Sequence, residues 1–157
     1  MAARLYLVCG LPGAGKTTRA REIAEATGAV RLCPDEWLVT LGVSLVDFEF
    51  RVRLQTHLMG HAGELLKAGI PVVVEFGSWH RSEREAIRQL AVRAGVPSEL
   101  HFVDAPVPEL VRRVRARGGP DAAILADKVL LEQAERFERP TEDETARFDR
   151  YRGPTDA

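Results

Sequence analysis

The sequence contains few lysines and cysteines, no long hydrophobic run and almost no net charge. Its 157 residues carry 22 basic and 23 acidic side chains, and the formal net charge is -1. Such a balance argues against a strongly basic nucleic-acid-binding protein and against a polyacidic tail, although it leaves room for a local basic patch. No stretch of about 18 apolar residues is present, so the sequence predicts no membrane-spanning helix.

Only two cysteines are present, Cys9 and Cys33, and neither belongs to a CxxC or Cys/His pattern. The spacing therefore argues against a disulfide framework or a cysteine zinc site and predicts buried, reduced thiols. The apolar run from Leu5 to Gly10 is too short for the core of a signal peptide. We expect a cytoplasmic protein.

Lysine is scarce relative to arginine, because 19 of the 22 basic residues are arginines. Codon bias explains an arginine-rich, lysine-poor chain without any functional cause. Against that background Lys16 is conspicuous, since it is the one lysine in the first 66 residues and it lies inside a motif.

The length fits a single domain, residues 1–157, with a sizeable core. Short apolar runs alternate with longer helical patterns, which is typical of an α/β fold with a parallel sheet. The predicted strands are 5–9, 29–33, 71–76 and 100–104, and 146–151 is a fifth, edge strand. The predicted helices are 15–27, 47–68, 82–94, 108–117 and 121–137, with a capping box at Ser82 and Glu85 for the third of them.

The first strand leads directly into a phosphate-binding pattern, Gly10-Leu11-Pro12-Gly13-Ala14-Gly15-Lys16-Thr17-Thr18. It matches G-x-x-x-x-G-K-[ST] at each fixed position and has the required strand before it and helix after it. Glycines allow backbone N–H groups to converge on phosphate oxygens, and the helix N-terminus adds its unpaired N–H groups. The pattern predicts a nucleoside triphosphate site with a Mg²⁺ ligand. The predicted contacts are Gly10, Pro12, Gly13, Ala14, Gly15, Lys16, Thr17 and Thr18, with Thr17 on the metal.

This loop alone does not separate a kinase from a GTPase or a motor ATPase. The sequence has no N-K-x-D pattern for reading guanine, and motor ATPases need a much longer chain. Asp35 follows the second strand and therefore opens onto the same crevice as the loop. A carboxylate there can accept a hydroxyl proton during phosphoryl transfer, but an Asp before a short helix can equally be an N-cap.

These residues resemble a family. Gly10 to Thr18 followed by Asp35 is similar to the small P-loop kinases that include phage polynucleotide kinase, chloramphenicol phosphotransferase and zeta-type toxins. The segments from Val72 to Arg81 and from Phe137 to Glu144 resemble the bacterial AAA-domain ATP-binding kinases of that group. The resemblance extends from about Leu5 to Glu144.

The resemblance implies a three-layer, nucleoside-kinase-like fold with a five-stranded parallel sheet in the order 2-3-1-4-5. It also implies ATP and Mg²⁺ as cofactors and Asp35 as the base. Arg113 and Arg117 are expected to be catalytic lid arginines in a segment of about 112–125, although Arg112, Arg113, Arg115 and Arg117 can also form a solvated helix face. Glu75 departs from the family, whose third strand usually ends in Asp.

Acceptor recognition is expected between the second and third strands and after the third strand. The candidate residues there are Arg53, Glu75, Trp79, Arg81 and Arg84. Aromatics in the first of these regions can also belong to the core, and the arginines can be helix-surface residues. His57 and His61 share a helix face, but the sequence offers no third metal ligand, so an exposed face is favoured.

The sequence thus predicts an ATP-dependent kinase that phosphorylates a hydroxyl of a small molecule such as an antibiotic, nucleoside or sugar. Two alternatives stay open. One is a 5′-hydroxyl polynucleotide kinase, which the near-neutral charge disfavours. The other is a nucleotide-dependent, toxin-like regulator that acts on a protein partner.

Overall fold

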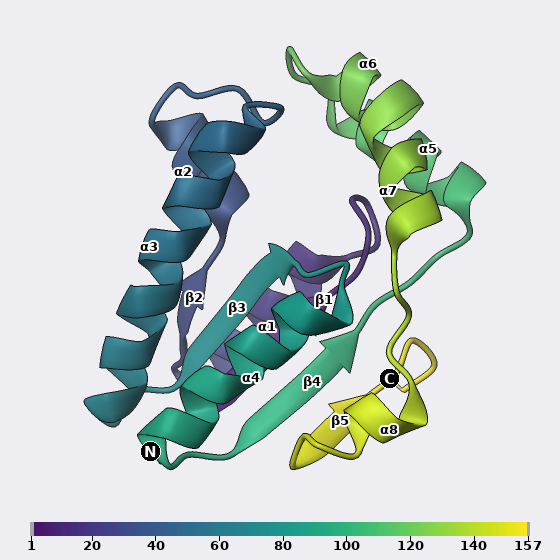
Figure 1. Cartoon of the computed structure of the whole chain (residues 1–157). Helices are drawn as coiled ribbons and strands as arrows, with labels where there is room; N and C mark the ends of the chain where they lie inside the picture. The colour runs from purple at the N-terminus through teal and green to yellow at the C-terminus, as the bar shows by residue number, and fades with distance from the viewer. Residues whose placement is uncertain (1, 157) are drawn as a thin grey trace.

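The computed structural model describes residues 2–156 and contains one parallel sheet of five strands within them. The strands are β1 (Leu5–Cys9), β2 (Val30–Leu32), β3 (Val72–Gly77), β4 (Ser98–Phe102) and β5 (Arg150–Arg152). Their order is β2-β3-β1-β4-β5, as expected, and Leu5 of β1 lies opposite Val72 and Ser98. All carboxyl ends therefore open at the same edge of the sheet (Figure 1).

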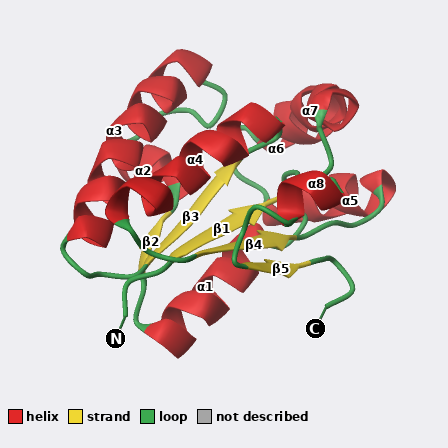
Figure 2. Ribbon diagram, turned by 60° about the horizontal axis from the view of Figure 1, so that its bottom comes forward, coloured by secondary structure: helices red, strands yellow, loops and turns green. Residues whose placement is uncertain are grey.

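Helices cover both faces of the sheet. The longer ones are α1 (Lys16–Thr27), α3 (Phe48–Lys67), α4 (Arg81–Ala94) and α5 (Val107–Arg117). Figure 2 shows α1 on one face and α3 and α4 on the other. Because both faces are covered, the inner strand β3 is buried at Val72, Val73 and Val74 in succession, which is why it reads as an unbroken apolar run.

Short helices complete the chain. They are α2 (Pro34–Thr40), α6 (Ala122–Ile124), the π-helix η1 (Leu125–Val129), α7 (Leu130–Arg136) and α8 (Glu142–Thr145). Segments α5 to α7 rise beyond the carboxyl edge of the sheet and face the upper end of α3 across it (Figure 1). A small apolar cluster that includes Leu11, Leu110, Val114 and Leu130 packs these helices against the phosphate-binding loop.

Several predicted boundaries were wrong. Strand β4 begins at Ser98 rather than at residue 100, because its buried polar residues have partners: the Ser98 N–H donates to Asp149, and Glu99 contacts Arg4 and His101. The edge strand β5 covers three residues instead of 146–151.

The helical predictions also need correction. The α4 capping box uses His80 and Glu83 instead of Ser82 and Glu85, so the N-cap lies two residues earlier than predicted. The expected helix 121–137 is divided by η1, α8 was not predicted, and α2 was considered only as a short helix that Asp35 could cap.

Three further expectations can be compared with the structure. Both cysteines lie in the described part of the chain and are buried free thiols, as predicted. No helix between residues 2 and 156 is long and apolar enough to cross a membrane. Within the same residues no group of three or more His, Cys, Asp or Glu side chains could hold a metal, so His57 and His61 gain no third ligand.

Candidate active site

The phosphate-binding loop connects β1 to α1 and is shaped by its backbone. Gly10 has φ 154°, and a Cβ there would lie 2.4 Å from the Val103 carbonyl oxygen, so only glycine fits. Gly15 occupies the N-cap of α1 in the left-handed conformation and provides no side-chain cap. Lys16 extends back over the loop and donates to the Leu11 carbonyl at 3.1 Å.

The first turn of α1 carries no acidic residue, whereas the first turns of α2, α3, α4 and α5 each carry at least one. Acidic side chains normally compensate the positive end of a helix. Their absence from α1, together with the missing cap, leaves that helix N-terminus available to an anion.

A hollow of about 490 Å³ lies between this loop and α5. Its lining residues are Gly13, Gly15, Thr18, Arg112, Arg113, Ala116 and Arg117. Arg113 donates to the Gly13 carbonyl at 3.1 Å and to Glu109 at 2.9 Å, so its guanidinium is fixed at the loop. Three arginines beside an uncompensated helix N-terminus form a strongly anion-attracting surface.

Thr17 and Glu75 meet where the loop approaches the end of β3. The Thr17 hydroxyl donates to Glu75 Oε1 at 2.9 Å, and Arg31 lies 3.3 Å from the same oxygen. Glu75 Oε2 is buried and has no hydrogen-bond partner among residues 2–156. A hydroxyl and a carboxylate with an unused oxygen fit the ligand preference of Mg²⁺.

Burial lowers the pKa of the Lys16 ammonium, and the charge of Arg117 adds to that effect, while Asp35 and Glu75 oppose it. Burial likewise raises the pKa of the Cys33 thiol to about 12, and the neighbouring Glu75 carboxylate acts in the same direction. Cys33 is therefore neutral at physiological pH and is no competitor of Glu75 for a cation.

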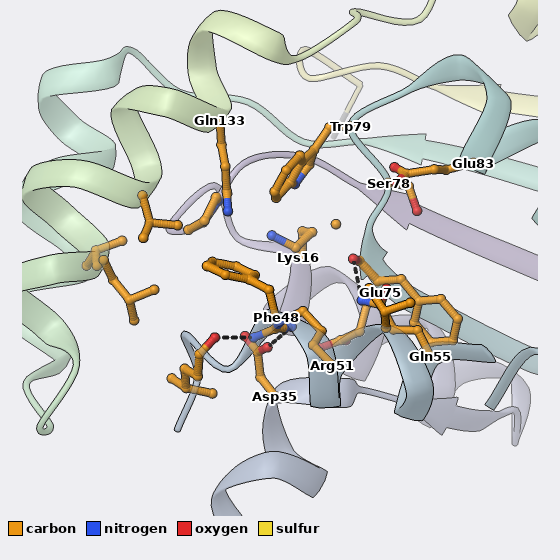
Figure 3. A pocket seen from close by; sticks show the side chains of 18 of the residues that line it. Lys16, Asp35, Phe48, Arg51, Gln55, Glu75, Ser78, Trp79, Glu83 and Gln133 are labelled. Carbon is orange, nitrogen blue, oxygen red and sulfur yellow. Dashed lines mark hydrogen bonds and ion pairs between the residues drawn. The ribbon is translucent and has the colours of Figure 1, made fainter. Parts of the chain in front are cut away.

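A second, larger cavity of about 510 Å³ opens beside Lys16 (Figure 3). It lies between α3, the segment after β3, and the segments α5 to α7. The residues that line it are Pro12, Lys16, Asp35, Leu45, Phe48, Arg51, Val52, Gln55, Thr56, Met59, Glu75, Phe76, Gly77, Ser78, Trp79, Glu83, Ala86, Ile87, Val114, Arg117, Gly118, Ala122, Leu125, Val129 and Gln133. The cavity thus joins the end of the phosphate-binding loop to a largely apolar chamber.

Asp35 lies in the first turn of α2, where Cys33 and not Asp35 is the N-cap. Its carboxylate is half exposed and accepts a hydrogen bond from Arg51 at 2.6 Å. The purely structural alternative, an N-cap, is therefore wrong for Asp35, and the carboxylate is directed toward the cavity.

The structure brings six of the predicted residues to this one cavity, namely Pro12, Lys16, Asp35, Glu75, Trp79 and Arg117. Arg117 lines the hollow beside the loop as well, so it borders both spaces. Arg113 belongs to that hollow alone.

The other three acceptor candidates do not line the cavity. Arg53 is exposed and packs over the ring of Phe50, and Arg81 pairs with Asp143 at 2.5 Å on the surface. Arg84 is fully buried, and its Nε donates to Glu144 at 2.5 Å while Nη1 donates to the Ser78 carbonyl at 2.9 Å and the Trp79 carbonyl at 3.1 Å. The prediction that Arg84 contacts an acceptor was wrong, because its buried guanidinium instead holds the backbone of Ser78 and Trp79 in place.

Sequence reasoning missed Gln55, Ser78 and Gln133 as members of the site and Asp121 as a bridge, and of the neighbouring Arg51 and Arg53 it selected Arg53. Arg51 and Gln55 follow Phe48 by three and seven residues, so helical spacing places them on its face, while Arg53 lies off it. Asp121 accepts from the Ser44 hydroxyl at 3.0 Å and the Leu45 N–H at 2.9 Å, which connects α6 to the segment before α3. No local sequence pattern predicts these long-range contacts.

The fold and the loop together define a P-loop nucleotide-binding α/β protein. The chain belongs to the AAA domain family, whose model matches residues 5–140. It is 36% identical over 113 residues to the adenylyl-sulfate kinase of Myxococcus xanthus, an alignment that covers 66% of this chain and 59% of that protein. The chain thus spans less than two thirds of that relative's length.

Solved structures share the same architecture. A gluconokinase from Sinorhizobium meliloti matches with a TM-score of 0.62 and 24% identity over 97% of this chain and 81% of its own. The APS kinase of Mycobacterium tuberculosis in complex with AMPPNP and APS matches with a TM-score of 0.65 and 20% identity over 99% of this chain and 91% of its own. At these identities the likeness establishes the fold.

Proposed function

We propose that the protein is an ATP-dependent phosphotransferase that transfers the γ-phosphoryl group to a hydroxyl of a small molecule. The observation that carries the proposal is that Lys16, Asp35 and Arg117 line one cavity at the mouth of the phosphate-binding loop. A phosphate-binding lysine and arginine on one side and a carboxylate on the other are the groups that phosphoryl transfer to an alcohol requires.

The nucleotide is assigned to the loop from Gly10 to Thr18 and to the hollow beside α5. That assignment is supported by the loop geometry, by the arginines around it and by the AMPPNP in the related APS kinase structure. Thr17 and Glu75 would hold Mg²⁺, which supplies charge neutralisation at the β- and γ-phosphate oxygens.

Asp35 acts as the general base. The acceptor oxygen attacks the γ-phosphorus, the bond from that phosphorus to the β,γ-bridging oxygen breaks, and ADP leaves. The hydroxyl proton passes to the Asp35 carboxylate, which Arg51 orients through the 2.6 Å contact. Lys16, Arg113 and Arg117 stabilise the negative charge on the transferring group.

We further propose that residues 1–157 act as one catalytic domain with a lid at about 112–125. The contacts of Asp121 with Ser44 and Leu45 support this assignment, because they hold the lid across the cavity. A closed lid excludes water, which would otherwise compete with the acceptor hydroxyl for the phosphoryl group.

The test is the Asp35→Asn variant, after acceptors have been found by a thermal-shift screen of alcohols in the presence of a non-hydrolysable ATP analogue. General-base catalysis contributes roughly 10²- to 10⁴-fold, so kcat should fall by that amount while the Kd for ATP stays unchanged. Glu49→Gln, a neighbouring exposed carboxylate in α3, is the matched control and should keep full turnover. Undiminished turnover in Asp35→Asn would overturn the assignment of the base.

A further inference from the structure

The arginine on the acceptor side of the cavity, Arg51, is already paired. Arg51 donates to Asp35 at 2.6 Å through one amino group and to the Leu45 carbonyl at 3.0 Å through the other. Glu83 adds a negative charge to the wall. Among the residues that the structure describes, the remaining cations lining the cavity are Lys16 and Arg117, and both lie at the phosphate-binding loop.

The body of the cavity is apolar and partly aromatic. Figure 3 shows the rings of Phe48 and Trp79 on opposite sides of the space that Lys16 enters. The indole packs against the backbone of Gly77, where a Cβ would lie 3.1 Å from its Nε1. A flat ring inserted between two aromatic walls gains contact on both faces.

Two residues that line the cavity, Ser78 and Gln133, each carry a buried polar atom without a partner. Ser78 and Gln133 are only 4% and 7% exposed, and within residues 2–156 neither Ser78 Oγ nor Gln133 Oε1 has a hydrogen-bond partner. They lie on different walls, since Ser78 follows β3 and Gln133 belongs to α7. Buried polar atoms of this kind favour a ligand that supplies the missing hydrogen bonds.

We infer that the acceptor is an uncharged alcohol that carries an aromatic ring and hydrogen-bonding groups for Ser78 and Gln133, and not an anion. This inference rests on the proposed kinase function. A carboxylate or phosphate on the acceptor would enter an apolar chamber beside Asp35 and Glu83 without a free cation to pair with it, which is costly. Adenylyl sulfate and gluconate, the anions in the names of two related kinases, therefore do not suit this wall.

The experiment compares a neutral and an anionic alcohol that are built on the same ring. Binding of 1,4-benzenedimethanol and of 4-(hydroxymethyl)benzoate to the protein loaded with a non-hydrolysable ATP analogue and Mg²⁺ is measured by calorimetry, with adenylyl sulfate and gluconate as further anions. The neutral diol should bind about tenfold or more tightly than the benzoate. Tighter binding of any of the three anions, or equal binding of the two ring compounds, overturns the inference.

Two variants locate the effect. Val52→Lys places a free cation on the cavity wall at a largely exposed position and should reverse the preference toward the benzoate. Val92→Lys, an exposed valine outside the cavity, is its control and should leave the preference unchanged. Gln133→Leu should weaken the binding of the diol by about fivefold to tenfold without changing the affinity for ATP. If Val52→Lys and Val92→Lys behave alike, the charge argument is wrong.

Turnover is measured separately with MgATP and the same compounds. Preferential binding of the diol without a phosphorylated product would contradict the proposed kinase activity while leaving the ligand class intact. Formation of product from the anions in preference to the diol would support the kinase activity and contradict the ligand class.

Discussion

The two sides of the crevice are built on different principles. On the nucleotide side, the proposed phosphate cradle comes from one continuous stretch, Gly10 to Thr18, which presents backbone groups and a helix N-terminus. The proposed acceptor side gathers side chains from α2, α3, the segment after β3, α4 and α7, and the ion pair between Arg51 and Asp35 holds two of them. Phosphate has a constant shape and suits a fixed backbone cradle, whereas a wall of separate side chains can change one residue at a time without affecting that cradle.

The strongest test of this comparison is Lys16→Ala on the nucleotide side. The only charged side chain of the continuous loop would be lost, and kcat with MgATP should fall by roughly 10³-fold or more, in keeping with the loss of a charge that stabilises a transferring phosphoryl group. Steady-state kinetics with an acceptor from the screen provide the measurement.

Lys67→Ala is the matched control, because Lys67 is exposed at the end of α3. It should retain turnover within a factor of two or so, as expected for an exposed charge. A comparable loss in both variants would show that the effect of Lys16 arises from general charge and not from its place in the loop.

The next largest effect is expected behind the acceptor wall, at the buried pair of Arg84 and Glu144. Arg84→Met leaves the Glu144 carboxylate buried without a partner and should lower the free energy of unfolding by about 3–5 kcal/mol. It also removes the donor to the Ser78 and Trp79 carbonyls, so acceptor KM should rise more than ATP Kd. Urea unfolding and kinetics measure the two effects.

The double variant Arg84→Met with Glu144→Leu separates stability from positioning. Stability should largely recover because no charge is left buried, while acceptor KM stays high because both carbonyls still lack their donor. Arg81→Ala, which removes the exposed partner of Asp143, should change neither quantity measurably. If both the acceptor KM and the stability of the double variant returned to the wild-type values, Arg84 would have only a structural role.

A smaller effect is expected where the two sides meet, at Arg117. Arg117→Ala should lower kcat by about 10²-fold, as the loss of one charge-stabilising donor does. Arg115→Ala is the control from the same helix, because Arg115 pairs with Asp127 and does not line either space. Equal losses in the two variants would mean that the arginine-rich end of α5 acts through its total charge.

The same contrast explains what the sequence could predict. The loop, the strand order and the boundaries of α1, α3 and α5 follow from patterns that are local in the chain or common to the resembled family, and they agree with the structure within one or two residues. Asp35 was located because every parallel strand opens onto one crevice, so its position after β2 was informative.

The acceptor wall was predicted less well, because it depends on which way each helix is rotated. Arg53 was favoured, yet the turn of α3 directs Arg51 to the cavity and leaves Arg53 outside. Gln133 is in a helix that η1 interrupts, and an inserted turn of that kind leaves no pattern in the hydrophobic periodicity. The partner of Arg84 is 60 residues away, so only the folded chain shows it to be buried.

The smallest effect concerns the outward surface of α4, the helix that also carries Arg84. Hydrogen bonds from Arg88 lower the pKa of the Glu85 carboxyl to about 2, well below the ordinary value of 4.5. Because the folded state binds this proton less readily, the pair stabilises the protein above pH 4.5, and the contribution is lost as the pH falls toward about 2.

Glu85→Gln should therefore lower the free energy of unfolding by about 0.3–0.5 kcal/mol at pH 7, typical of a partly exposed pair within a helix, and the difference from wild type should shrink on acidification. Urea unfolding at pH 7 and below pH 4 measures this, and ATP affinity at pH 7 should not change, because the nucleotide side does not depend on α4. A loss of several kcal/mol, or a difference that grows as the pH falls, would show that the outward pairs of α4 support the acceptor wall as strongly as the buried one does.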